Sequence, residues 1–223
     1  MPATRQRTRH ARPPAESARE RAKAETREAL VQAALAEFAA HGLDAPSLDA
    51  ICARAGFTRG AFYVHFRSRD DLVVAVMERA FEAFLDAIVP AGGEAHDFER
   101  TVGRYAELME GLLGLREQRG RAGVPQAEGV PLHRILEACA RAPALRARFV
   151  ALLAQAGERL AHIVAAGQRA GTVRDDLAPQ TAGALLVAVA LGFLTAIDAG
   201  APVDAPAARA AVLTLFAPAN GRR

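Results

Sequence analysis

Residues 47–66 read SLDAICARAGFTRGAFYVHF, and this stretch decides the fold of the N-terminal part of the chain. Ser47 is a preferred residue for capping the start of a helix, and Gly56 ends that helix about nine residues later. Thr58 supplies a second cap, for a helix that continues to about Phe66. Two short helices joined by a glycine-containing turn are typical of the helix-turn-helix motif.

Apolar residues at helical spacing define how the two helices pack on each other. The first helix and the turn contribute Leu48, Ile51, Cys52, Ala55 and Phe57, and the second helix contributes Phe62 and Phe66. The side chains expected to point outward from the second helix are those of Thr58, Arg59, Gly60, Tyr63 and His65. For His65 the alternative is a packing role between helices, and for Cys52 a place in the core is favoured over redox sensing.

The outward set suits a DNA duplex. Thr58 and Tyr63 offer hydroxyl groups to phosphate oxygens, and Arg59 offers charged donors. The small Gly60 allows close approach, and base edges would be read in the major groove. The predicted DNA-binding residues, including those that flank the motif, are Arg27, Ser47, Thr58, Arg59, Gly60, Tyr63, His65 and Arg69.

The rest of the chain has helical spacing and no strand-like alternation, which predicts an all-α fold. Thr26 is the expected cap of a helix that precedes the motif and ends at Gly42, and Ser68 is the expected cap of a long helix after it. Further helices are predicted at about 96–118, 131–141, 144–170, 179–199 and 205–216, with a loop at 119–125. The expected domains are a disordered basic arm at 1–23, a helix-turn-helix domain at 24–70 and a larger helical body at 71–223.

The segment from Thr26 to Leu72, and above all GFTRGAFYVHFRSRDDL at 56–72, resembles the DNA-binding head of the TetR (tetracycline-repressor-like) transcriptional regulators. The shared pattern is a glycine turn, a hydroxyl residue, a basic residue, a glycine and then aromatic-x-His-Phe. Val64 stands where a second aromatic residue is often found. The resemblance implies that Thr58, Arg59, Gly60, Tyr63 and His65 face DNA. It also implies dimerisation through the last two helices and an effector site in the body.

The basic charge of the chain is concentrated at its start. Residues 1–23 hold seven basic and two acidic side chains, whereas the whole chain has a formal charge of +3. Such an arm favours binding to nucleic acid or to an anionic membrane. A solvated tail is the alternative, and the two interpretations stay open at this point.

Residues 177–197 contain no charge, and helical spacing places apolar side chains on all sides of this segment. A helix that is apolar all round is buried all round, and a partner subunit would cover it. The predicted dimer-interface residues are Leu185, Leu186, Val189, Phe193, Leu213 and Phe216. A membrane association of 182–197 is the alternative, although the segment is short for a bilayer span.

The helices between the head and this segment contain the candidates for an effector cavity. The predicted ligand-binding residues are Met77, Phe81, Tyr105, Met109, His133 and Phe149. For any one of them, ordinary core packing is the alternative.

The sequence therefore predicts a cytoplasmic homodimer that binds a palindromic operator and is released by a small-molecule effector, most simply a repressor. No metal-ligand spacing, phosphate-binding loop or nucleophile motif is found, so we expect no cofactor, no metal and no enzyme activity. The alternatives are a helical dimeric binding protein and a membrane-associated protein without specific DNA binding.

Overall fold

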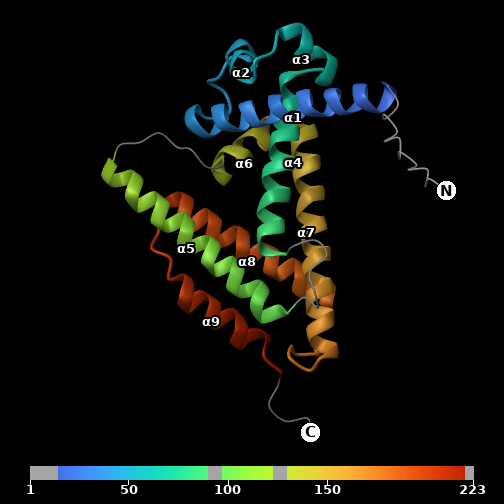
Figure 1. The fold of residues 1–223 in the computed structure, drawn as a ribbon. Helices are drawn as coiled ribbons and strands as arrows, with labels where there is room; N and C mark the ends of the chain where they lie inside the picture. Colours follow the sequence, from blue (N-terminus) through green and yellow to red (C-terminus); the bar gives the residue numbers. More distant parts are fainter. Residues whose placement is uncertain (1–14, 90–96, 123–129, 219–223) are drawn as a thin grey trace, which may run out of the picture.

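The computed structural model describes residues 15–89, 97–122 and 130–218, and over these residues the chain forms nine α-helices and no strand. Figure 1 shows two parts, with α1, α2 and α3 at one end and the remaining helices extending away from them. The prediction of an all-α fold with an N-terminal head and a larger helical body is confirmed.

The head consists of α1 (Ala15–His41), α2 (Leu48–Ala55) and α3 (Arg59–His65) around a closed apolar core. Phe38, Ile51 and Phe62 are fully buried there, and Leu72 from the next helix completes the cluster. Because every helix of the head contributes side chains to this one cluster, the orientation of α3 is fixed by packing.

Three consecutive helices begin at the hydroxyl residues that the sequence indicates. Ser47 caps α2 by accepting a hydrogen bond from the Ala50 amide, and Thr58 caps α3 through the Ala61 amide. Ser68 does the same for α4 (Arg69–Ile88) through the Asp71 amide. Since each bond satisfies an amide that would otherwise lack a partner, these residues set where the helices start.

The start of α1 differs from the prediction. Thr26 lies inside the helix, where its hydroxyl donates to the Ala22 carbonyl, and the helix begins at Ala15. The last part of the predicted disordered arm, residues 15–23, is therefore helical. Residues 1–14 lie outside the described part of the chain, and no structure is assigned to them.

The helix α4 joins the two parts of the molecule (Figure 1). Leu72 and Val76 near its start are buried with the head core, while Ile88 at its end is buried among body residues. One rigid element therefore connects the recognition motif with the body.

The body contains α5 (Phe98–Ala122), α6 (Leu132–Arg141), α7 (Pro143–Arg169), α8 (Pro179–Ala199) and α9 (Ala205–Phe216). The helices match the predicted ranges closely, except that α5 continues through the first four residues of the predicted loop. The rest of that loop lies outside the described residues.

The closest approach in the body is between α7 and α8. Gly183 on α8 lies so near α7 that a β-carbon built on it would be 2.3 Å from the Gly157 carbonyl oxygen. Both helices are long and apolar enough to cross a membrane by length and composition alone. In α7 and α8 only 33% and 17% of the apolar window is buried within the protomer, which leaves apolar surface to be covered by something else.

Candidate DNA-binding surface and body cavity

The exposed side of α3 is held outward by the buried side of the same helix. Phe62 is fully buried, and its ring packs at 5.3 Å from the ring of Phe66. The neighbouring side chains of Tyr63 and Val64 are 57% and 67% exposed.

Arg59 and Thr58 lie at the start of α3, as predicted. The Arg59 guanidinium is exposed and forms an ion pair of 3.4 Å with Asp49 of α2. Such an exposed pair is worth less than about 1 kcal/mol, so a phosphate can displace it. The Thr58 and Ser47 oxygens accept backbone hydrogen bonds, and their hydroxyl hydrogens are left to donate.

His65 lies half-buried at the end of α3, next to α1. Burial lowers the pKa of His65, and the nearby charges of Lys23 and Arg27 lower it further. The guanidinium of Arg27 itself lies 5.2 Å from the centre of the Phe66 ring. The first helix thus brings positive charge to the end of the recognition helix.

Arg69, predicted to contact a flanking phosphate, is also bonded within the protein. Its two terminal nitrogens donate to the carbonyl oxygens of Leu43 and Pro46, and the guanidinium lies 5.4 Å from the centre of the Phe38 ring. The side chain is partly buried. These donors therefore fasten the segment between α1 and α2 to the start of α4, and the phosphate contact stays a prediction.

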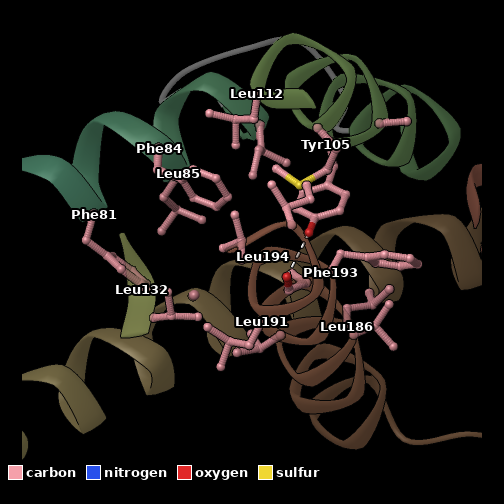
Figure 2. A pocket seen from close by; sticks show the side chains of 18 of the residues that line it. Phe81, Phe84, Leu85, Tyr105, Leu112, Leu132, Leu186, Leu191, Phe193 and Leu194 are labelled. Atoms are coloured by element: carbon pink, nitrogen blue, oxygen red, sulfur yellow. Dashed lines mark hydrogen bonds between the residues drawn. The ribbon is translucent and has the colours of Figure 1, made fainter. Parts of the chain in front are cut away.

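The body encloses a cavity of about 740 Å³ between α4, α5, α6, α7, α8 and α9. All six residues predicted to bind a ligand lie on its wall: Met77, Phe81, Tyr105, Met109, His133 and Phe149. In Figure 2, apolar side chains from different helices point toward the same space, among them Phe81, Leu112 and Leu194. A volume of this order holds a drug-sized molecule.

Few polar groups line this cavity. The Tyr105 hydroxyl donates to the Ala190 carbonyl oxygen at 2.8 Å (Figure 2), and burial raises the pKa of Tyr105. The buried Thr101 donates to the Asp97 carbonyl oxygen. The cavity therefore favours a largely apolar occupant, with hydrogen bonding confined to a few points.

The charged groups of the wall are tied to neighbours. Asp198 of α8 accepts a hydrogen bond of 3.2 Å from the His133 amide of α6 and lies 3.4 Å from the His133 ring nitrogen. Arg209 of α9 forms a 3.4 Å ion pair with Glu99. Sequence analysis did not identify Asp198, because its role depends on a contact between residues 65 positions apart.

The helix α8 lines the cavity on one side and is exposed on the other. Leu186, Val189 and Phe193, predicted for the dimer interface, are partly buried and lie on the cavity wall. Phe216 is a correction: it is 4% exposed and packs 5.2 Å from the Phe98 ring of its own protomer. Leu213 also packs in the protomer core, whereas Leu185 is 43% exposed.

Most of the exposed residues of α8 and of α9 are small, and two are leucines; Gln180, Pro206 and Arg209 are exposed as well. The small residues and leucines are Thr181, Ala184, Leu185, Ala188, Gly192, Thr195 and Ala199 on α8, and Ala207, Ala210, Ala211, Thr214 and Leu215 on α9. Hydrophobic periodicity does not reveal this division, since both sides of α8 are apolar. We call this surface the α8–α9 face.

Among the described residues, no group of three or more His, Cys, Asp and Glu side chains could hold a metal ion. Cys52 and Cys139 are both buried and unpaired, and burial raises the pKa of each thiol. The candidate functional sites among the described residues are therefore the exposed side of α3 and the body cavity.

Comparison with known proteins finds a family match in the head. The family model described as "Bacterial regulatory proteins, tetR family" matches residues 30–76, which include α2, α3 and the first turns of α4. The segment of α2 and α3 is therefore similar to the helix-turn-helix of the tetR-family regulatory proteins.

The curated relatives are similar to this chain mainly in the head. The transcriptional regulator SrpR of Pseudomonas putida is 43% identical over 53 residues, which are 24% of this chain and 25% of SrpR. TcmR of Streptomyces glaucescens is 28% identical over 160 residues, covering 71% of this chain and 66% of TcmR. The matched segments thus span less than two thirds of these relatives.

The fold of the whole described chain is also found among solved structures. The structure of a SmeT–triclosan complex superposes with a TM-score of 0.65 and 24% sequence identity, covering 87% of this chain and 93% of that one. At this identity the likeness concerns the fold. The helical body of this chain therefore has the fold of the body in that structure.

Proposed function

We propose that the protein is a cytoplasmic repressor that binds a palindromic operator as a homodimer and leaves it when a largely apolar small molecule fills the body cavity. The observation that carries this proposal is the cavity of about 740 Å³, whose wall includes α4, the helix that also enters the head core. A ligand that favours one arrangement of α4 shifts the population of head positions by its difference in affinity for the two states.

The α8–α9 face supports the homodimer. Its small side chains allow two helices to approach closely, and Leu185 supplies an apolar contact in their midst. A two-fold dimer presents two recognition helices, and each would read one half of a symmetric site. Half-sites on one side of the duplex lie about 34–36 Å apart, or a multiple of that distance.

The chemistry of the cavity supports an apolar effector. Its wall carries the rings of Phe81, Phe84, Phe149 and Phe193, with Tyr105 as a hydrogen-bonding group among them. The SmeT structure similar to this one is a complex with triclosan. We therefore propose an aromatic, weakly polar molecule as the effector, and no reaction is part of the proposal.

Selection of bound duplexes from a random pool by the purified protein tests operator binding. We expect one motif with two-fold symmetry. The Arg59→Ala, Tyr63→Ala double variant should lose at least tenfold in affinity for it while keeping the helical content and the oligomeric state of the wild type. Absence of any selected motif, or a monomer at the concentration of the binding assay, would contradict the proposal.

Filling the cavity tests the effector role. Nile red, an apolar fluorophore, should bind the wild type with an increase in emission and should lower its affinity for the selected duplex. Leu194→Trp narrows the cavity and should bind DNA without responding to Nile red. Leu136→Trp is the matched control because Leu136 is exposed and does not line the cavity. Equal responses from both variants would count against the cavity as the effector site.

A further inference from the structure

The first helix extends beyond the segment that the TetR-family model describes. That segment begins at Leu30, whereas α1 begins at Ala15. At 1.5 Å per residue, the additional part of α1 is about 22 Å long. The side chains described along it, from Ala18 to Glu28, are exposed apart from Thr26. The head core therefore does not require most of this extension, and its sequence is not explained by packing.

One side of the extension is basic. Arg19, Lys23 and Arg27 are spaced four apart, which places them along one side of an α-helix. Glu20 lies at the edge of that side and reduces its charge by one. The opposite side carries Arg21, Glu25 and Glu28. We call the line of Arg19, Lys23 and Arg27 the α1 ridge.

The α1 ridge faces the recognition helix. Arg27 lies against the Phe66 ring at the end of α3, at 5.2 Å from the ring centre. Lys23, one turn further out, is near enough for its charge to act on His65 of α3. Arg19 continues the same line by another turn. The ridge thus begins beside α3 and leads away from it.

We propose that the α1 ridge binds the phosphates of the DNA flanking the segment that α3 contacts. The inference rests on the proposed operator binding and adds a second, sequence-independent surface to it. Three positive side chains that follow one line fit the regular row of negative charges along a duplex strand. Phosphate contacts of this kind raise affinity and fix register without reading bases.

The length of the ridge sets how much DNA it covers. From Arg27 to Arg19 the helix rises about 12 Å, and phosphates of one strand follow at about 3.4 Å along the duplex axis. The ridge would therefore span about three to four base pairs beyond the recognition helix. Each protomer of a dimer would extend the contacted duplex outward by that length.

The salt dependence of DNA binding tests this inference. Arg19→Gln with Lys23→Gln should reduce the slope of log K against log salt by about 1.8 for each bound protomer, because each phosphate contact contributes about 0.9. The matched control is Arg21→Gln with Arg169→Gln, which removes the same charge from the other side of α1 and from α7. Its slope should stay at the wild-type value.

Two further measurements of DNA binding change the charge beside the α1 ridge and the length of the duplex. Glu20→Gln should strengthen binding and steepen the slope, because it removes a carboxylate at the edge of the ridge. Duplexes trimmed by four base pairs on each side of the selected motif should bind the wild type more weakly than longer ones. The ridge double variant should bind both lengths alike.

The outcomes separate the inference from the function on which it rests. If the wild type selects no duplex, the proposed function fails. If it selects one and the ridge and control variants have equal slopes, the α1 ridge does not bind DNA although α3 does. Circular dichroism at 222 nm of both double variants checks that α1 remains helical, and Ala in place of Gln at the same positions repeats the test if it does not.

Discussion

The head and the body of this protein are specified in different ways. In the head, α2, α3 and α4 each begin at a serine or threonine whose oxygen accepts a backbone amide three residues on. In the body, α6, α7 and α8 begin at Pro131, Ala142 and Ala178, and none of these makes a side-chain capping bond. The head helices are fixed by local sequence, and these body helices depend on their neighbours.

The two regions also differ in how they are filled. The head core is closed, with Leu30, Phe38 and Phe62 fully buried. The body surrounds a cavity of about 740 Å³. A closed, locally capped motif tolerates few substitutions, whereas the wall of a cavity accepts many side chains of similar polarity. This accounts for the relative that matches at 43% identity over 53 residues and for the lower identity over longer spans.

The largest test of this contrast compares two phenylalanines. Phe62→Ala in the closed head should lower the free energy of unfolding by about 4 kcal/mol, because it leaves a new void. Phe81→Ala on the cavity wall should cost only about 1 kcal/mol, since its ring already borders empty space. Urea unfolding followed by circular dichroism measures both. Equal losses would mean that the cavity is packed as tightly as the head core.

The crossing of α7 and α8 is tightly packed, in contrast to the cavity. Gly183→Ala should lower the free energy of unfolding by about 3 kcal/mol, because the new methyl group meets the backbone of α7. Gly111→Ala on α5 has open space around it and should raise stability by about 1 kcal/mol. A neutral Gly183→Ala in thermal and urea unfolding would show that α8 shifts freely along α7.

Arg69 tests whether a charged side chain of the head serves the fold or the DNA. Arg69→Ala should cost about 2 kcal/mol of stability, because it removes charged donors from two carbonyl oxygens. Arg69→Lys should recover only part of the loss, since an ammonium group lacks the planar fork. The salt slope of DNA binding should not change. A reduced slope with intact stability would support the phosphate contact expected from the sequence.

Removal of the Ser47 cap tests whether local sequence fixes the start of α2. Ser47→Ala should lower the free energy of unfolding by about 1 kcal/mol, through the loss of the bond from the Ala50 amide. Ser47→Asp keeps an acceptor at this position and should restore most of that loss. Thermal unfolding at low salt measures the difference. A stable Ser47→Ala variant would mean that packing alone fixes the start of α2.

The smallest effect is expected at Glu28 on α1. Hydrogen bonds from Gln32 and Arg79 lower the pKa of Glu28 below its usual 4.5. Its stabilisation is therefore present above that value and is lost as the pH falls through the folded-state pKa. Because the group is largely exposed, Glu28→Gln should cost less than about 0.5 kcal/mol at pH 7. The difference between variant and wild type in urea unfolding should shrink toward pH 3, and a growing difference would contradict the sign.

The sequence predicted the head almost residue by residue because its signals are local. Ser47, Thr58 and Ser68 cap helices where expected, and Gly42 and Gly56 end them with positive φ angles of 83° and 76°. The start of α1 was mispredicted because a threonine inside a helix resembles a cap until its backbone partner is known. The hydroxyl of Thr26 bonds back to the preceding turn instead.

The parts that the sequence did not predict depend on long-range contacts. The partners of Arg69 are carbonyl groups 23 and 26 residues away, and the buried position of Phe216 depends on Phe98. The six predicted cavity residues all line the cavity because the apolar faces of helices must meet, but periodicity does not say where the packing leaves space. Likewise, the sequence of α8 is apolar on every side, so it does not show which side lines the cavity and which side is exposed.

The hydrogen bond between Asp198 and the His133 amide gives α6 an unusual dependence. The proline before α6 provides no side-chain acceptor, so an acceptor for the first turn of α6 comes from the last turn of α8. At its far end, α6 is joined to the head by the 2.9 Å ion pair between Arg141 and Asp44. The last turn of α8 and the head are therefore connected through α6, by a hydrogen bond at its start and an ion pair at its end. The first turn of α6 thus depends on the position of the last turn of α8 for its hydrogen-bond acceptor.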